Sequence, residues 1–547
     1  MLKRRREDPQ PSVPPTKRAR NAKTGSLDRL SSLSDELLLH ILSFLPISSL
    51  NVCQSLSRRF NALSGDSELW KRQYYSQWVR PRARRLANSR RTTLAPSKTE
   101  YSPKVSTWFD HSHLAEDGRV TNWKRQYRLR HNWSKGACRV TEVEFAEPPC
   151  PPMLVKLCAG IVFTADSTYG LRAWTANDPK SCLARASFSD GQSKSSATAP
   201  TALAVSQQKD GIEIVVGFVN GCFSLYFWNP QTFHLDLRSS HIGSSGGAIT
   251  AMASSSPYLL MVSQHKILSL YNLRPTPHAA GSATAAKEPQ QLASLRADNI
   301  VAPMTLSLRV SPFDITATIV YSFFHIGCGW SLGIQELRLG KDGQQRDSQL
   351  ATTVDSQYGI QPLQGLPQTR KRRHSTAQYE SSASGAPSVP SIIHQQPPTS
   401  MSYSHPYLLT SHADNTLTMY LVVSTTNTLF VRGGQRLWGH TSSVSAVQVT
   451  NRGKAVSVSS RGDELRIWEL EMAVASLNTR RPVEENSIQI SAENKPPLPG
   501  PVLEANPVGL TAGATRMQGC VGFDEERVVL LREKGIGTPL LECYDFT

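Results

Sequence analysis

Few residues in this 547-residue sequence have the types and spacing that a catalytic or metal site requires. Neither a phosphate-cradling GxxxxGK[ST] loop nor an HExxH zinc motif occurs. His111 and His113 have no further ligands at metal spacing, and the nine cysteines include no CxxC pair. We therefore expect a non-catalytic protein without metal or cofactor, in a reducing compartment.

One short basic run could receive a covalent modification. Arg372 and Arg373 precede His374 and Ser375, which is the arrangement that a basophilic kinase reads through its acidic cleft. The same run could instead be an import signal or a solvated stretch of charge. Ser375 is therefore a candidate phosphosite with two open alternatives.

The formal net charge of +17 is not spread evenly along the chain. The whole excess lies in residues 1–139, whereas basic and acidic residues balance over residues 140–547. A neutral main body argues against a nucleic-acid groove there, so we do not expect nucleic acid as a partner.

Residues 1–25 have the composition of a disordered tail. Two basic clusters, residues 3–6 and 17–20, flank a proline-containing spacer, as in signals read by nuclear import receptors. No secretory signal opens the chain and no apolar run approaches the length of a membrane helix. We expect an intracellular protein of the nucleus, the cytoplasm or both, without a membrane segment.

Residues 26–80 have helical periodicity. An apolar stripe at positions i, i+3, i+4 and i+7 consists of Leu38, Ile41, Leu42 and Leu45. Pro46 ends this helix, a second is expected from about residue 48 to Gly65, and a third from Asp66 towards Trp78. Three short helices bury too little surface to be stable alone, so they are expected to pack on something else.

Residues 81–139 form a basic neck with interleaved aromatic residues. Such a pattern can stack on single-stranded nucleic acid. The stretch WKRQYRLRHNW is equally a helix with Trp123 and Tyr127 at i and i+4 on its packed side. We favour a packed helical linker, because no RNA-binding signature accompanies it.

Residues 140–547 repeat one theme: an apolar strand, a turn, and an alternating strand that ends in an aromatic residue. Seven copies are found, some spaced as the blades of a β-propeller are. Two stretches rich in polar residues and proline, about 346–402 and 478–508, are predicted to be disordered insertions. The predicted fold is therefore multidomain, with a short all-α unit of three helices followed by an all-β propeller of seven blades.

The segment LSSLSDELLLHILSFLPISSLNVCQSLSRRFNALSGDSELW closely resembles an F-box, a three-helix motif that binds a Skp-type adaptor and through it a cullin-RING ubiquitin ligase. Its DELLLHILSFLP core, LNVC middle and closing SELW occur in the family's order. It departs from the family where Leu33-Ser34 replaces the frequent Leu-Pro. The resemblance implies adaptor contacts by Leu33, Ser34, Leu38, Ile41, Leu42, Leu45, Pro46 and Leu50.

The segment LWGHTSSVSAVQVTNRGKAVSVSSRGDELRIWEL resembles a WD repeat, with Trp-Glu where Trp-Asp is usual. In that family a buried His, a Ser or Thr, a turn Asp and the Trp brace the blade through hydrogen bonds. The resemblance implies these structural roles for His440, Ser457, Asp463 and Trp468. The other copies largely lack the GH and WD pairs.

Together these resemblances imply the substrate receptor of an SCF (Skp-cullin-F-box) E3 ubiquitin ligase in the ubiquitin and proteasome pathway. The F-box would bind the adaptor, and the propeller would hold a target protein whose binding motif is in some receptors phosphorylated. Sequence alone does not place Arg172, Arg432, Arg436 and Arg461 on a common face. The alternative is a nuclear propeller scaffold outside any ligase, for protein or RNA-protein assembly.

Overall fold

A computed structural model of the chain describes two compact units. The first comprises residues Met1–Pro81 and Leu114–Tyr127, and the second Arg82–His113 and Arg128–Thr547. Within them the structure describes residues 30, 32–80, 121–144, 153–175, 182–188, 199–243, 246–274, 289–296, 301–357, 392–425, 427–462, 464–470, 487–492, 516–534 and 538–547.

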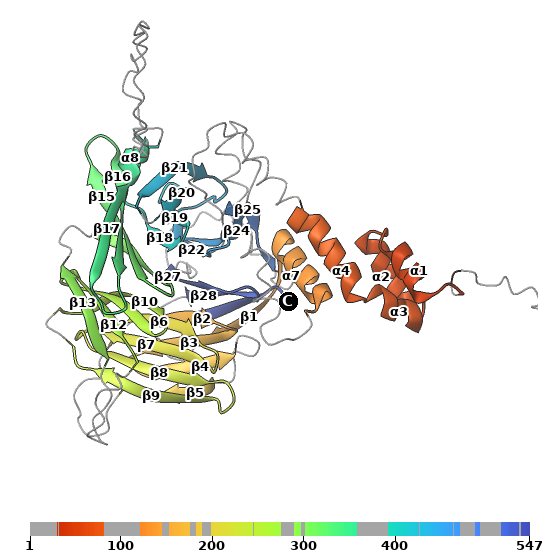
Figure 1. The fold of residues 1–547 in the computed structure, drawn as a ribbon, viewed down its shortest axis with the longest axis horizontal. Helices are drawn as coiled ribbons and strands as arrows, with labels where there is room; N and C mark the ends of the chain where they lie inside the picture. The colour runs from red at the N-terminus through yellow and green to blue at the C-terminus, as the bar shows by residue number, and fades with distance from the viewer. Residues whose placement is uncertain are drawn as a thin grey trace, which may run out of the picture. The chain divides into compact units, whose positions relative to one another are not determined.

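The described part of the first unit is helical (Figure 1). Its elements are α1 (Asp35–Leu42), α2 (Ile47–Leu56), α3 (Arg58–Ser64), α4 (Ser67–Tyr74), the π-helical turn η1 (Tyr75–Val79) and the start of α7 (Trp123–Lys135). Leu42, Leu50 and Leu69 form the centre of its core. Trp70, Trp123 and Tyr127 form a second, aromatic cluster.

The second predicted helix is in fact two helices. Ser57 has an extended backbone between α2 and α3, and its hydroxyl accepts a hydrogen bond from the backbone N–H of Phe60 at 3.2 Å. Serine is a favoured N-cap because its side chain satisfies one of the first free N–H groups of a helix. The prediction of three helices is therefore corrected, since the chain turns at this cap.

The second unit is a β-propeller of seven sheets among the described residues, and the predicted seven-bladed fold is confirmed (Figure 1). Blades 1 to 3 are β2–β5 (Leu154–Cys158, Ile161–Asp166, Gly170–Thr175, Cys182–Ala186), β6–β9 (Pro200–Gln207, Ile212–Phe218, Phe223–Asn229, His234–His241) and β10–β13 (Ile249–Ser255, Tyr258–Ser263, Ile267–Asn272, Gln290–Arg296). Blades 4 to 6 are β14–β17 (Val301–Val310, Ile315–His325, Gly329–Leu339, Gln345–Thr352), β18–β21 (Ser400–Ser404, Tyr407–Ser411, Leu417–Ser424, Leu429–Leu437) and β22–β25 (Val444–Val449, Lys454–Ser459, Leu465–Glu469, Ser487–Gln489).

Blade 7 closes the ring with strands from both ends of the propeller sequence. It contains β27–β29 (Arg516–Phe523, Arg527–Lys534, Thr538–Asp545), β1 (Ala137–Glu144) and β26 (Ser491–Ala492). β1 pairs antiparallel with β29 from Arg139 opposite Asp545 to Glu144 opposite Leu540. The innermost strands contact one another in order around the ring, and β27 contacts β2. This closure leaves no open end of the propeller at blade 7.

Each pair of neighbouring blades shares one apolar layer. Between blades 4 and 5, for example, Val320 and Ile334 pack against Leu408 and Val422. Between blades 6 and 7, Val456 and Ile467 pack against Val528 and lie in the same cluster as Trp133 of α7. Sheet faces that are buried on both sides explain why the strand sequences read as nearly continuous apolar runs.

The boundaries of the two predicted insertions are wrong at their edges. Most of β17, the short helix α8 (Thr353–Gln357) and the start of β18 lie inside the range 346–402, and β25 and β26 lie inside 478–508. β17 carries mainly polar residues, but it is the outer strand of blade 4 and pairs along β16. Similarly β1 begins at Ala137, inside the predicted linker. Residues 358–391 and most of the second range lie outside the described residues.

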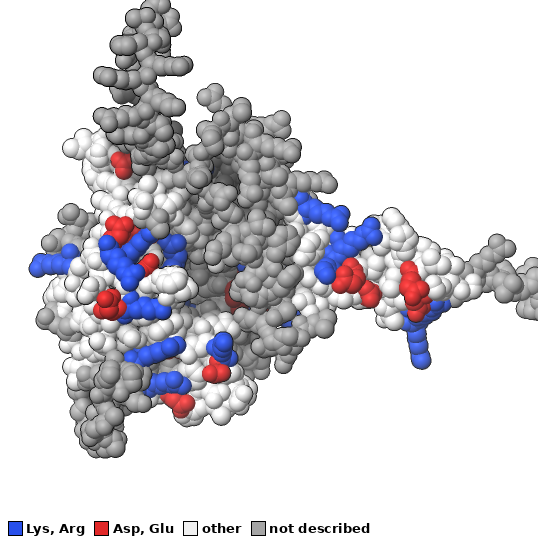
Figure 2. All heavy atoms as spheres, viewed as in Figure 1, with Lys and Arg blue, Asp and Glu red and all other residues white. Residues whose placement is uncertain are grey.

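Charge on the visible face of the structure is mixed, with Lys and Arg interspersed with Asp and Glu (Figure 2). No helix in the described part of the chain is long and apolar enough to cross a membrane. Within the same residues no group of three or more His, Cys, Asp or Glu side chains is placed to hold a metal ion.

Candidate functional site

The first candidate site is the helical unit that resembles an F-box. The predicted adaptor-binding residues Leu38, Leu42 and Leu50 are at most 2% exposed and lie inside the unit. Leu42 and Leu50 pack on Leu69 in its core. A unit this small must bury its own leucines to fold, so the burial of these three argues against the prediction that they contact a partner directly.

A second apolar stripe on α1 faces outward. Leu37 is 53% exposed, Ile41 42% and Phe44 67%. These residues lie at i, i+4 and i+7, so they share one side of the helix and its C-terminal turn. The sequence prediction contained Ile41 but missed Leu37 and Phe44, because the two apolar stripes of this helix are adjacent and only burial tells them apart.

Further apolar residues are exposed on α2, and Phe44 of the stripe has polar neighbours. Val52 and Leu56 on α2 are also more than half exposed. Phe44 packs edge-on against His40, with the Arg72 guanidinium 5.5 Å from its ring centroid. An exposed apolar set of this kind is a typical protein-binding surface.

The start of α1 is fixed by ionic contacts rather than by a serine cap. Ser34 is exposed, and its side chain makes no capping hydrogen bond. Arg59 donates to Asp35 Oδ1 at 2.9 and 2.6 Å and to the carbonyl of Leu33 at 2.6 Å, which ties α3 to α1. Because these contacts hold the first turn, the departure at Ser34 leaves the helix start intact. Of the other predicted contact residues, Leu33 and Leu45 are half-buried and Pro46 is exposed.

The second candidate site is the hydrogen-bond chain of blade 6. The structure brings three of its four predicted members together: His440 Nε2 lies 2.6 Å from Ser457 Oγ, and Trp468 Nε1 donates to the same Oγ at 2.7 Å. All three side chains are buried. A histidine held in this way braces the blade and is not placed for catalysis.

Glu464 occupies the position of the acid in this chain. His440 Nδ1 lies 3.1 Å from its Oε2, and the backbone N–H of Thr441 donates to the same oxygen at 2.9 Å. Burial favours a higher pKa for Glu464, but the two Thr441 hydrogen bonds, His440 and Arg466 outweigh burial and lower it. Asp463 lies outside the described residues. The sequence prediction named Asp463 because Asp is usual at this position of the family, and it did not consider the adjacent Glu464, whose side chain is one methylene longer.

Blade 1 contains part of the same arrangement. Trp174 Nε1 donates to Thr164 Oγ1 at 2.9 Å. Asp166, completely buried, accepts from Arg172 at 2.9 Å. Arg172 is therefore committed to an internal ion pair and is not available to a phosphorylated target.

The helix α7 uses its aromatic residues for packing. In the first unit Trp123 lies 5.5 Å from Tyr74, and Tyr127 lies 5.4 Å from Trp70, both measured between ring centroids. In the second unit Trp133 stacks on Phe546 at 4.0 Å. The predicted helix is present, and rings engaged in this way are not free to stack on nucleic-acid bases.

Besides Asp463, three predicted features lie outside the described residues. They are the candidate phosphosite Ser375, the basic clusters at residues 3–6 and 17–20, and His111 with His113.

Comparison with known protein families gives two matches. The description "F-box-like" matches residues 30–76, and "F-box protein pof12 beta-propeller" matches residues 138–547. The F-box protein pof12 of Schizosaccharomyces pombe is 22% identical over 467 residues, which cover 80% of this chain and 84% of that protein. The F-box protein dre-1 of Caenorhabditis elegans is 49% identical over 47 residues, 9% of this chain and 5% of that protein.

Comparison with solved structures finds two similar chains of low sequence identity. The RRP9 WD40 repeats are similar with a TM-score of 0.40 at 10% identity, over 74% of this chain and 97% of that one. BamB from Moraxella catarrhalis gives a TM-score of 0.36 at 8% identity, over 74% and 99%. The helical unit with its exposed stripe, the seven-bladed ring and the two family matches agree, and this chain belongs to the family of F-box proteins with the pof12-type β-propeller.

Proposed function

We propose that this chain is the substrate-recognition subunit of an SCF-type E3 ubiquitin ligase. Its F-box binds a Skp-type adaptor, and its propeller holds a target protein for ubiquitination. The observation that carries the proposal is the outward apolar stripe of Leu37, Ile41 and Phe44 beside a core that is already complete. A helical unit with a finished core gains nothing for its own stability from such a stripe, so a partner is the physical reason for it.

The chain itself supplies no chemistry in this proposal. Transfer of ubiquitin to a lysine belongs to other subunits, and the receptor raises the rate by holding the target near the loaded enzyme. Catalytic motifs are not needed for that role. We further propose that the protein acts in the nucleus, the cytoplasm or both. Imaging of the tagged full chain, with and without neutral residues in place of the basic residues at 3–6 and 17–20, would test this proposal.

The adaptor interaction is tested by changing the exposed stripe. Ile41→Asp with Phe44→Asp places two carboxylates in the proposed interface, and we expect the affinity of the full chain for a Skp-type adaptor to fall at least about 100-fold. Isothermal titration with purified adaptor measures this directly. Both side chains point to solvent, so the helical unit should keep its fold by circular dichroism.

A matched control adds the same charge elsewhere on the unit. Ala62→Asp on α3 with Ser76→Asp on η1 changes two exposed residues outside the stripe, and we expect affinity within about threefold of wild type. Undiminished binding by the stripe variant, or no adaptor binding by wild type, would favour the alternative of a propeller scaffold outside any ligase.

A further inference from the structure

The turn end of blades 4 and 5 carries an exposed apolar surface. β15 and β16 are each 11 residues long, and their pairing continues to His325 opposite Gly329. Ile326, in the turn between them, is 96% exposed, and Phe324 is 61% exposed. Trp438, after β21, is 66% exposed. Together with Trp330, Ile393 and Arg436 we call these residues the blade 4–5 surface.

Contacts join the blade 4 part of this surface to the segment that enters blade 5. Phe324 and Trp330 lie with ring centroids 5.9 Å apart, and the N–H of Trp330 donates to the carbonyl of His394 at 2.8 Å. Gly329 has φ +70°, and a Cβ there would lie 2.4 Å from the His394 carbonyl oxygen. Only glycine permits this close approach, which places Ile393 against the hairpin.

Beneath the surface lies a pair of histidines that carry no charge at neutral pH. His394 and His412 are buried and stack with ring centroids 3.8 Å apart. Their Nε2 atoms contact the hydroxyls of Thr418 and Thr410 at 3.3 and 3.0 Å. Burial, together with the nearby Arg436 guanidinium, lowers the pKa of His394 to about 4, and burial and His394 lower the pKa of His412 to about 3.

Arg436 is the cation of this surface, and its hydrogen-bonding capacity is unused. Its side chain is 28% exposed, its Nε is buried without a partner, and among the described residues its guanidinium makes no hydrogen bond. The carboxylate of Asp414 is 3.9 Å away, beyond hydrogen-bond distance, and its other oxygen accepts from Thr416. The guanidinium carbon lies 5.8 Å from the Trp438 ring centroid.

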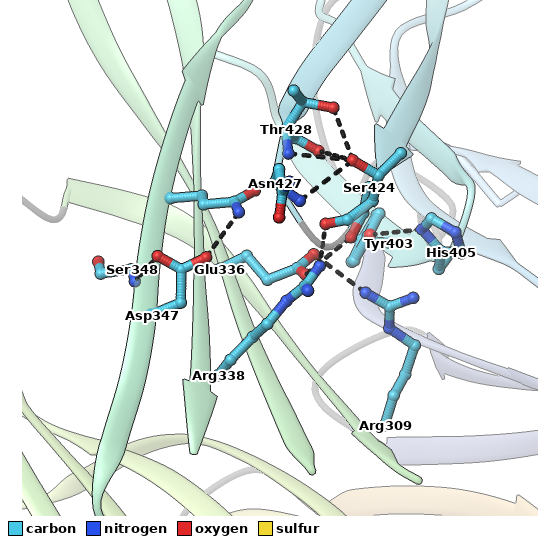
Figure 3. Close-up of polar contacts among 12 residues, drawn as sticks. Arg309, Glu336, Arg338, Asp347, Ser348, Tyr403, His405, Ser424, Asn427 and Thr428 are labelled. Carbon is cyan, nitrogen blue, oxygen red and sulfur yellow. Dashed lines mark hydrogen bonds and ion pairs between the residues drawn. The ribbon is translucent and has the colours of Figure 1, made fainter. Parts of the chain in front are cut away.

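The opposite end of the same two blades shows two arginines whose terminal nitrogens bind a buried carboxylate (Figure 3), although the Nε of Arg309, like that of Arg436, has no partner among the described residues. There Arg309 donates to the buried Glu336 at 3.0 Å and Arg338 at 3.3 Å, while Ser424 of blade 5 donates to it at 2.7 Å. That cluster clamps blade 4 to blade 5. Among the described residues the guanidinium of Arg436 has only the Asp414 carboxylate at 3.9 Å, which points to a ligand from outside the chain.

We propose that the blade 4–5 surface binds an extended segment of a target protein in which an Asp or Glu carboxylate adjoins an apolar side chain. This inference rests on the proposed function. The carboxylate accepts from Arg436, and the apolar side chain packs on Trp438 or on the Phe324–Ile326 turn. A partly desolvated guanidinium beside exposed aromatic residues is the combination that dominates binding energy at protein interfaces.

The charge of the surface favours a carboxylate over a phosphoryl group. Asp414 lies beside the Arg436 guanidinium, so a dianion would meet repulsion as well as attraction. Phosphopeptide sites normally offer several arginines to one phosphate. A single negative charge matches what Arg436 can neutralise.

The test is selection of displayed random peptides on the immobilised full chain, followed by fluorescence titration of the enriched peptides. We expect the enriched peptides to share an acidic residue next to an apolar one. Replacing that residue by its amide, or Arg436→Gln in the protein, should each weaken binding about tenfold or more. Trp438→Ala, at a position too exposed to affect folding, should weaken binding as well.

Arg346→Gln is the matched control, since Arg346 is exposed at the opposite end of blade 4 and should leave affinity unchanged. No acidic enrichment, equal binding by Arg436→Gln, or tighter binding of a phosphoserine analogue would overturn the assignment. Adaptor titration separates the two proposals. Peptide binding without adaptor binding would refute the ligase function alone, and adaptor binding without acidic peptides would refute this surface alone.

Discussion

Removal of the Ser457 hydroxyl is a demanding test of the blade 6 hydrogen-bond chain. In Ser457→Ala the His440 ring nitrogen and the Trp468 N–H, now 2.6 and 2.7 Å from a common oxygen, both lose their partner in a buried site. An orphaned buried polar group costs about 1–3 kcal/mol. Two such groups predict a loss of about 2–6 kcal/mol in the free energy of opening of this blade.

Native-state hydrogen exchange of the amides in β23 and β24 is the suitable assay. It reports the opening of blade 6 itself, whereas unfolding of the whole chain mixes two units. The control is Ser445→Ala on β22, whose half-buried hydroxyl donates only to carbonyls at 3.3 Å, and a loss below about 1 kcal/mol is expected. If the losses in opening free energy of Ser457→Ala and Ser445→Ala agree within about 0.5 kcal/mol, the hydrogen-bond chain does not brace the blade.

Three further predictions concern stability. Leu42→Ala should lower the free energy of unfolding of the helical unit by about 2–5 kcal/mol. Leu37→Ala should change the melting temperature of the unit little and weaken adaptor binding instead. Equal melting temperatures of the two variants would refute the assignment of Leu42 to the core and Leu37 to the binding surface. The lowered pKa of Glu464 gives stability that is present above the ordinary value of 4.5 and lost as the pH falls through the folded value, so acid unfolding of Glu464→Gln should show a weaker pH dependence. Burial and Arg130 lower the pKa of Lys454 from 10.5 to about 8, so between these pH values the unfolded chain binds more protons than the folded chain. The stability of the wild type against urea should therefore increase as the pH rises from about 8 to 10.5, and that of Lys454→Met should not show this increase.

The helical unit shows where periodicity is sufficient and where it is not. Spacing alone located the apolar residues of α1, because every third or fourth position repeats on one side of a helix. It could not separate Leu38 and Leu42, which face inward, from Leu37 and Ile41, which face outward. That difference depends on where α2 and α4 pack, and no local pattern contains it.

The propeller likewise has features that a local sequence pattern predicts and features that it does not. Repeated strand and turn patterns were enough to predict seven blades, since each blade must hide two apolar faces. The polar composition of β17 concealed a strand, because an outer strand is held by backbone pairing to β16 more than by apolar side chains. The contact of Glu464 with His440 in blade 6 could not be predicted, because only the folded turn brings the two side chains together.

The sequence by itself determined the two kinds of unit, their order and three of the residues that brace blade 6, because periodicity, turn residues and short motifs are local properties. Only the tertiary structure decided which leucines of α1 are available to a partner. It also brought Phe324 and Arg436 to one surface above the buried His394, since these residues come from three separate elements that meet only when blades 4 and 5 pack side by side.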